Sequence, residues 1–188
     1  MDHKMTKLNV FDLDDTLLRI PTYTSKFHME ETFDNMKLND PYDFYDHWCS
    51  LDRVLHNIQF IDPVLSDLKQ GISEKSTMSV LITHRVESLR HNVMEILISN
   101  GIEFDDSYFL GRKSKKAEVV AKILKKHQSI SHITIYEDSV AQILQYSQVF
   151  VENPEYHGKT FEFYIVDKSR VFKLTSLNLT DVRSIKLI

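Results

Sequence analysis

The most informative segment of the chain is Leu8-Asn9-Val10-Phe11-Asp12-Leu13-Asp14-Asp15-Thr16-Leu17. Residues 8–11 are apolar enough to form a short buried strand, and they run directly into Asp12. Asp14 follows two residues later. Two carboxylates this close repel each other unless a cation lies between them. The segment therefore predicts a strand that ends at an acidic, cation-dependent site.

Beyond this segment, short apolar strands alternate with helical patterns from residue 61 to about residue 151. Such alternation predicts an α/β fold with a parallel sheet and crossover helices. The sequence also marks where helices begin and end. Asp62 and Pro63 suit the N-cap and first turn of one helix, Ser114 suits the N-cap of another, and Gly101 suits the position just after a helix C-terminus. We expect strands at 77–82, 106–110, 132–136, 149–151 and 161–166, and helices at 62–71, 86–97, 114–124 and 139–146.

Polar side chains follow three of the expected strands at the point where each strand ends. Parallel α/β sheets bind ligands at the carboxyl ends of their strands, so these side chains are the candidate site. A carboxylate there can act as nucleophile, a second can pass a proton, and an acidic pair on another strand can complete an oxygen site for Mg²⁺. The residues are Asp12 and Asp14, then Thr83, His84 and Arg85, then Glu137 and Asp138. This set suits phosphoryl transfer through an aspartyl-phosphate.

Four short motifs in this order resemble those of the haloacid dehalogenase (HAD) phosphohydrolases. Residues 11–17 are similar to the DxDxT motif, Leu81-Ile82-Thr83 to the second motif, and Tyr136-Glu137-Asp138-Ser139 to the fourth motif in its ED form. A lysine among Lys113, Lys115 and Lys116 stands where the third motif is expected. The resemblance spans residues 11–139 and implies a HAD-like, three-layer Rossmannoid core with a parallel sheet.

The resemblance also implies a role for each matching residue. Asp12 is the expected nucleophile, and Asp14 the expected proton donor and then base. Mg²⁺ is expected on Asp12, Asp138 and the backbone carbonyl of Asp14, with Glu137 acting through water. Thr83 is expected on the phosphoryl group, together with Lys116, which falls in the first turn of a predicted helix; Lys113 is the alternative. The candidate substrate-binding residues are Thr16, His84, Arg85 and Lys113.

Within that family, the second and fourth motifs resemble the HAD domain of Swiss Army Knife RNA repair proteins, and the layout is similar to the phosphatase half of bacteriophage polynucleotide kinase-phosphatases. The segment Trp48–Leu55 matches a tryptophan-containing stretch of the former, whereas Ser139 departs from its usual arginine. Both resemblances imply a substrate with a terminal phosphate on RNA or DNA, and we expect the enzyme to remove a 3′-phosphate. The alternatives are a phosphatase of nucleotides or other small metabolites, and a non-catalytic module that binds a partner.

Composition sets the remaining expectations. The 188 residues fit a single domain (1–188), with an aromatic and acidic insertion at about 20–60 as a small helical cap. The chain has one cysteine, Cys49, and no P-loop motif, and no run of it has the length of a membrane span. We therefore expect an intracellular, cytoplasmic protein.

A basic run stands out against the net charge of −4. We expect it either to be a solvated helix face or to track a phosphate backbone beside the site. Its members are Arg112, Lys113, Lys115, Lys116, Lys122, Lys125 and Lys126. Arg85 likewise has two interpretations, contact with substrate or pairing with a surface carboxylate.

Overall fold

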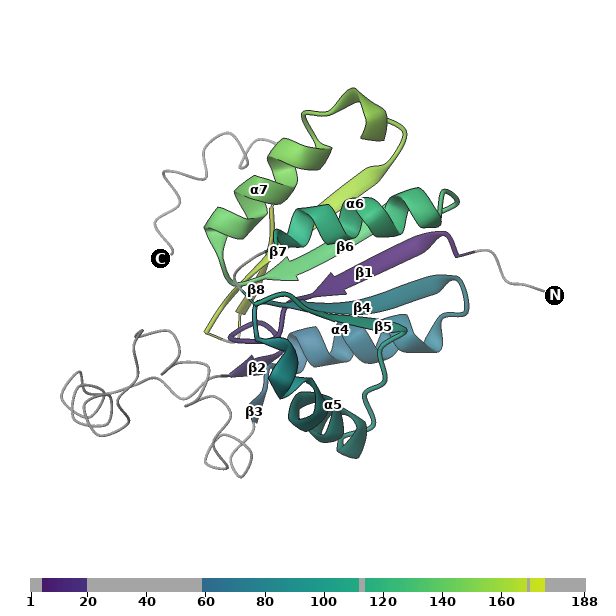
Figure 1. Ribbon diagram of the computed structural model, residues 1–188. Coiled ribbons are helices and arrows are strands. Elements are labelled where there is room, and N and C mark those ends of the chain that lie inside the picture. The colour runs from purple at the N-terminus through teal and green to yellow at the C-terminus, as the bar shows by residue number, and fades with distance from the viewer. Residues whose placement is uncertain (1–4, 20–58, 112–113, 169, 175–188) are drawn as a thin grey trace.

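The computed structural model describes residues 5–19, 59–111, 114–168 and 170–174. Six strands form one twisted sheet in the order β5-β4-β1-β6-β7-β8 (Figure 1). The first five are parallel and β8 is antiparallel to β7. This arrangement confirms the α/β fold with a mainly parallel sheet.

The elements follow the alternation that the sequence predicts. The strands of the main sheet are β1 (Lys7–Phe11), β4 (Thr77–Thr83), β5 (Asp106–Phe109), β6 (His132–Glu137), β7 (Thr160–Asp167) and β8 (Arg170–Leu174). A separate pair consists of β2 (Leu18–Arg19) and β3 (Gln59–Phe60). The helices are α4 (Asp62–Ser73), α5 (Arg90–Ser99), α6 (Lys116–Lys126) and α7 (Val140–Phe150), with 3₁₀ turns η1 (Glu87–Leu89) and η2 (Pro154–Tyr156).

Helices cover both faces of the sheet, which gives three layers (Figure 1). Leu8 and Val10 of β1 pack toward α6 and α7, whereas Phe11 packs on the other face with α4 and α5. The same alternation holds along β4 and β6, because successive side chains of a strand point to opposite faces. Two apolar cores, one on each face, thus fix β1 at the centre of the sheet.

Some predicted boundaries are wrong. The N-cap position of α4 is Ile61 and not Asp62, and that of α6 is Lys115 and not Ser114; neither carries a side-chain cap. Residues 149–151 are not a strand: 149 and 150 end α7, and Val151 is its C-cap. The sequence reasoning also did not anticipate β8, a short edge strand whose side chains are mostly not buried.

The insertion expected at about 20–60 begins and ends on described backbone. Leu18 pairs with Phe60 and Arg19 with Gln59 in an antiparallel ribbon, so the two ends of the insertion are neighbours. Residues 20–58 between them, with Trp48 and Cys49, lie outside the described residues, as do Arg112 and Lys113. The helical cap therefore stays a prediction. Of the helices that are described, none combines the length and apolar character needed to cross a bilayer.

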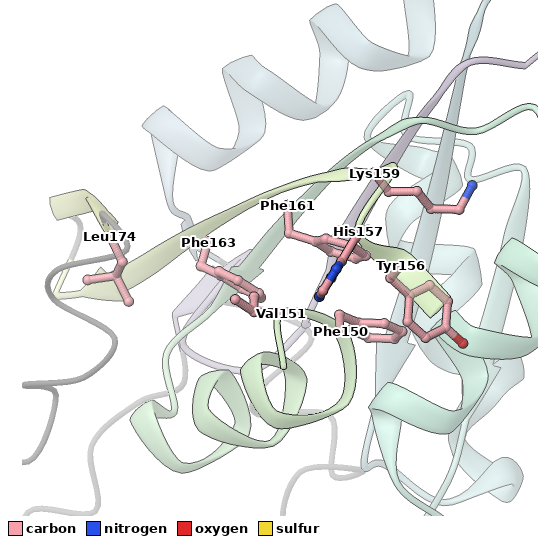
Figure 2. Close-up of a pocket in the computed structure, with 8 residues that line it drawn as sticks. All are labelled: Phe150, Val151, Tyr156, His157, Lys159, Phe161, Phe163 and Leu174. Atoms are coloured by element: carbon pink, nitrogen blue, oxygen red, sulfur yellow. The ribbon is translucent and has the colours of Figure 1, made fainter. Parts of the chain in front are cut away.

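An aromatic hollow of about 270 Å³ lies against α7 (Figure 2). Its walls include Phe150 and Phe161, whose rings stack with centroids 4.9 Å apart. Thr160, the first residue of β7, pairs with His132, the first residue of β6. The part of the hollow lined by Phe161 therefore lies near the amino ends of these strands, away from their carboxyl ends. None of the predicted site residues lines it.

Candidate active site

The end of β1 presents two carboxylates in one tight turn. The backbone N–H of Asp12 donates to the carbonyl of Tyr136 at 3.1 Å, which continues the parallel pairing with β6 by one residue. The chain then turns back on itself, because the N–H groups of Leu17 and Leu18 both donate to the Leu13 carbonyl. Asp15 takes a left-handed conformation at φ 55°. The turn keeps Asp12 and Asp14 together at the carboxyl end of β1.

The strands on either side of β1 bring other predicted residues to the same end of the sheet, where the carboxyl ends of the strands lie. Phe11 is in register with Leu81 of β4 and with Tyr136 of β6. Because these strands are parallel, Thr83 and Glu137 emerge beside Asp12. Both are almost fully buried, at 1% relative exposure each. The convergence at the strands' carboxyl ends therefore comes directly from the register of the central three strands.

Asp12, Glu137 and Asp138 form an acidic cluster. Each contributes a carboxylate oxygen, and these oxygens lie within 4.8 Å of one another. Burial, with repulsion from Asp12, raises the pKa of Glu137 well above its usual value and that of Asp138 to about 6. The carboxylates of the cluster thus repel one another and are costly to ionise together.

Lys116 is the ammonium that contacts this cluster. Its Nζ lies 2.6 Å from Oδ1 of Asp12 and 2.7 Å from Oε2 of Glu137, and the residue is 2% exposed. Burial opposes the charge on Lys116, but the two carboxylates outweigh it and raise its pKa above the usual lysine value. The first turn of α6 therefore places a charged lysine against Asp12 and Glu137; its role in the reaction stays a prediction. Lys113, the alternative, is outside the described residues.

Arg85 lies against the second carboxylate of the turn. Its Nε is 3.0 Å from both Oδ1 and Oδ2 of Asp14, and its Nη2 is 2.6 Å from Oδ1. Burial raises the pKa of Asp14, and Arg85 opposes that shift. Sequence reasoning named both residues but missed their pairing. They are 71 positions apart, and only their places after neighbouring strands bring them together.

Three further predicted residues surround this end of the sheet. The Thr83 hydroxyl accepts a hydrogen bond from the backbone N–H of Arg85 at 3.1 Å. Thr16 is fully buried, and its hydroxyl has no hydrogen-bond partner within the described part of the chain. Burial, aided by nearby Lys116, lowers the pKa of His84, which favours its neutral form. Thr83 and His84 thus supply uncharged polar groups beside the charged pairs.

The donor set fits a hard divalent cation. Three carboxylates face one ammonium in the cluster, so negative charge is in excess there. Mg²⁺ prefers oxygen ligands of this kind and would offset that excess. Asp12, Asp138 and Glu137 are the residues placed to hold it.

The chain is similar to a known protein family and to some solved structures. The family model described as "HAD domain family 1 in Swiss Army Knife RNA repair proteins" matches residues 55–177. Among curated proteins, no sequence matches the chain. The solved structures similar to it include one titled "Structure of Pnkp1/Rnl/Hen1 complex", at 15% identity and a TM-score of 0.49, and one titled "Structure of the Pnkp1/Rnl/Hen1 RNA repair complex", at 13% and 0.48.

Those two structural matches differ in how much of each partner they cover. They include 78% and 85% of this chain but 44% and 42% of the matched chains. This chain therefore spans less than half the length of either.

Proposed function

Because this chain belongs to the family of HAD domains found in Swiss Army Knife RNA repair proteins, we propose that it is a Mg²⁺-dependent phosphatase that removes a terminal 3′-phosphate from a nucleic acid. The observation that carries the proposal is the arrangement around Asp12. Its carboxylate lies at the end of the central strand, contacts Lys116 at 2.6 Å, and clusters with Glu137 and Asp138. Asp14 follows two residues later on the same turn.

In the first step of the proposed reaction, a carboxylate oxygen of Asp12 attacks phosphorus. A bond forms between that oxygen and phosphorus, and the bond from phosphorus to the substrate's 3′ oxygen breaks. Asp14 gives its proton to the departing oxygen, so that the product leaves as a hydroxyl.

In the second step, water attacks the phosphorus of the aspartyl-phosphate. Asp14, now ionised, takes a proton from that water. Inorganic phosphate leaves and Asp12 is regenerated. Asp14 thus donates one proton and recovers one in each cycle, so the balance of protons closes.

The surrounding residues stabilise the charge that develops. Lys116 lies against Asp12 and offsets negative charge on the transferring group. Thr83, with Thr16, His84 and Lys113, is proposed to contact the phosphoryl group or the substrate. Bound Mg²⁺ would neutralise the carboxylates and the phosphate oxygens, held by Asp12, Asp138 and the Asp14 carbonyl, with Glu137 through water.

The proposal is tested by phosphate release in Mg²⁺ from three substrates of matched sequence. These are a 3′-phosphorylated oligonucleotide, the same oligonucleotide phosphorylated at its 5′ end, and the corresponding nucleoside 3′-monophosphate. Asp12→Asn and a chelator-treated sample serve as blanks. We expect release from the 3′-phosphorylated oligonucleotide to be fastest, and we expect both blanks to be inactive.

The other outcomes identify the alternatives. Equal or faster turnover of the mononucleotide would make the protein a phosphatase of small metabolites. Release that persists in Asp12→Asn would remove the nucleophile from the proposal. Absence of release from any phosphate ester, with retained binding of nucleic acid, would indicate a non-catalytic module.

A further inference from the structure

The guanidinium of Arg85 contacts a carboxylate of the site, that of Asp14. We propose that Arg85 is a positioning residue, which acts on the reaction by holding the carboxylate of Asp14 in the orientation that proton transfer needs. This inference rests on the proposed function and assigns a part within it. Direct contact between Arg85 and the substrate, which the sequence alone allows, is the alternative.

The contact has the geometry of a fixed fork. Nε of Arg85 lies 3.0 Å from each oxygen of Asp14, and Nη2 lies 2.6 Å from Oδ1. A planar guanidinium that meets a carboxylate through two neighbouring donors restricts rotation of the carboxylate as well as its position. The edge of Arg85 formed by Nε and Nη2 is therefore engaged by Asp14.

Arg85 is itself held in place. The residue is 5% exposed, and its backbone N–H donates to the Thr83 hydroxyl at 3.1 Å. Its carbonyl accepts from the N–H of Gly111 at 3.1 Å, and Gly111 has the positive φ of 56° that suits glycine. The backbone around Arg85 is thus tied to the ends of both β4 and β5. A buried, doubly anchored arginine transmits the position of these strands to Asp14.

A fixed direction matters because Asp14 must serve two partners in turn. It donates to the leaving oxygen in the first step and accepts from water in the second. A carboxyl group free to rotate spends little time aligned with either partner, and small misplacements in an active site are costly to the rate. Loss of Arg85 should therefore slow proton transfer and leave the attack of Asp12 on phosphorus largely intact.

The discriminating experiment is burst kinetics with p-nitrophenyl phosphate, whose leaving group departs without a proton. In Arg85→Gln we expect the first turnover of p-nitrophenolate to stay within about threefold of the wild type. The steady-state rate should fall roughly 100-fold or more, because water still needs Asp14 as its base. A first turnover that slows together with the steady state, with a raised KM, would overturn the inference in favour of a phosphoryl contact.

A double-mutant cycle gives an independent readout with the 3′-phosphorylated oligonucleotide. If Arg85 acts through Asp14, then Arg85→Gln should lower kcat/KM by no more than about threefold when Asp14 is already Asn. Multiplied losses would contradict the inference.

Arg85→Lys is the matched variant that keeps the buried charge and so protects folding, but loses the fork. We expect Arg85→Lys to behave as Arg85→Gln does; recovery of wild-type rates in Arg85→Lys would contradict the inference. A wild-type protein that releases no phosphate would overturn the proposed function itself, whereas the outcomes above overturn only the role of Arg85.

Discussion

At the scale of single residues, the ammonium of Lys116 compensates the negative charge of the acidic cluster. It contacts Asp12 and Glu137 from a position that is almost fully buried. Breaking a buried ion pair by removing one partner is far more costly than losing a surface pair, because the remaining charges lose their compensation. The exposed Lys122 on the same helix offers a matched comparison, since its side chain is in solvent.

We predict that Lys116→Met lowers the free energy of unfolding by about 3–5 kcal/mol in a chelating buffer. Part of that loss should return in Mg²⁺, because a cation between the carboxylates replaces some of the missing charge. Denaturant unfolding with and without Mg²⁺ measures both effects. Lys122→Met is the control and should change stability by less than about 0.5 kcal/mol. Equal stability of the two variants in chelator would contradict this account of the cluster.

The pKa of Asp138 predicts how the metal-free protein responds to pH. Burial, together with repulsion from Asp12, raises its pKa to about 6, from 3.8 when it is unperturbed. A raised pKa means that the folded state binds the proton more tightly than the unfolded state does. The contribution of this group to stability is therefore full below about pH 4 and is lost as the pH rises to about 6.

We predict that the stability of wild-type protein in chelator, relative to that of Asp138→Asn, falls between about pH 4 and pH 6. The comparison with Asp138→Asn cancels other groups, such as Glu74, whose pKa its hydrogen bond to Lys7 lowers. Affinity for Mg²⁺ should rise over the same range, because the carboxylate must lose its proton to bind the ion. Parallel pH profiles for the two proteins would show that Asp138 is not the group responsible.

At the scale of elements, α4 approaches the sheet at a glycine. A Cβ on Gly71 would lie 2.6 Å from Nδ2 of Asn9 and 3.1 Å from Oγ of Ser79, which are both side chains of the central strands. The first distance is shorter than van der Waals contact allows. Gly71 therefore sets how closely α4 can pack over β1 and β4.

We predict that Gly71→Ala lowers the free energy of unfolding by about 1–3 kcal/mol, despite the higher helix propensity of alanine. Adding Asn9→Ala should remove most of the effect, because it deletes the nearest clashing atom. Gly158→Ala is the control, since a Cβ on Gly158 would meet nothing within 4 Å. Thermal or denaturant unfolding of these proteins, together with the Asn9→Ala single variant, measures the effect, and a Gly71→Ala protein as stable as the wild type would contradict the prediction by showing that the Asn9 side chain moves aside without cost.

The elements also show which patterns a sequence reveals and which it hides. β1, β4 and β6 were predictable because buried parallel strands are short apolar runs that end at polar residues. Val149-Phe150-Val151 has the same apolar character. Phe150, however, continues the helical spacing of the buried residues Ile143, Tyr146 and Ser147, and residues 149 and 150 belong to α7. β8 is an exposed edge strand, so it lacks the apolar run that marks the central strands.

The same contrast applies to the site. Asp12, Thr83 and Glu137 could be named from sequence because they lie at the carboxyl ends of three neighbouring parallel strands: Asp12 directly after β1, and Thr83 and Glu137 as the last residues of β4 and β6. The pairing of Arg85 with Asp14 could not, since it depends on side-chain rotamers and on the turn after β1. The sequence favoured Lys116 because it falls in the first turn of the predicted helix, and the structure places Lys116 against Asp12 and Glu137.

At the scale of the whole molecule, a polymeric and a small substrate differ in how many phosphates can contact the basic side chains of the protein. The protein carries a formal net charge of −4, yet Lys122, Lys125 and Lys126 are exposed on α6, the helix whose first turn holds Lys116. A nucleic acid that lies along such lysines releases counterions when it binds. A mononucleotide has no further phosphates to contact them.

We predict that kcat/KM for the 3′-phosphorylated oligonucleotide falls roughly 7–20-fold between 50 and 200 mM salt, as expected for two or three phosphate contacts on a single strand. The nucleoside 3′-monophosphate should show a much shallower dependence. Replacing Lys122 and Lys126 by alanine should flatten the oligonucleotide profile, whereas the same change at the exposed Lys69 and Lys75 should leave it unaltered. A flat profile in the wild type would remove this helix from the substrate path.

In the proposed reaction, the phosphoryl group is bound covalently to Asp12 before it is transferred to water. The most direct measurement is the stereochemical course at phosphorus, followed with a substrate whose transferred phosphate is chiral through oxygen isotopes and sulfur. Each in-line displacement inverts the configuration, so attack by Asp12 followed by attack by water predicts overall retention. Overall inversion would show that water attacks the substrate directly, and the account of Asp12 as nucleophile would then be wrong.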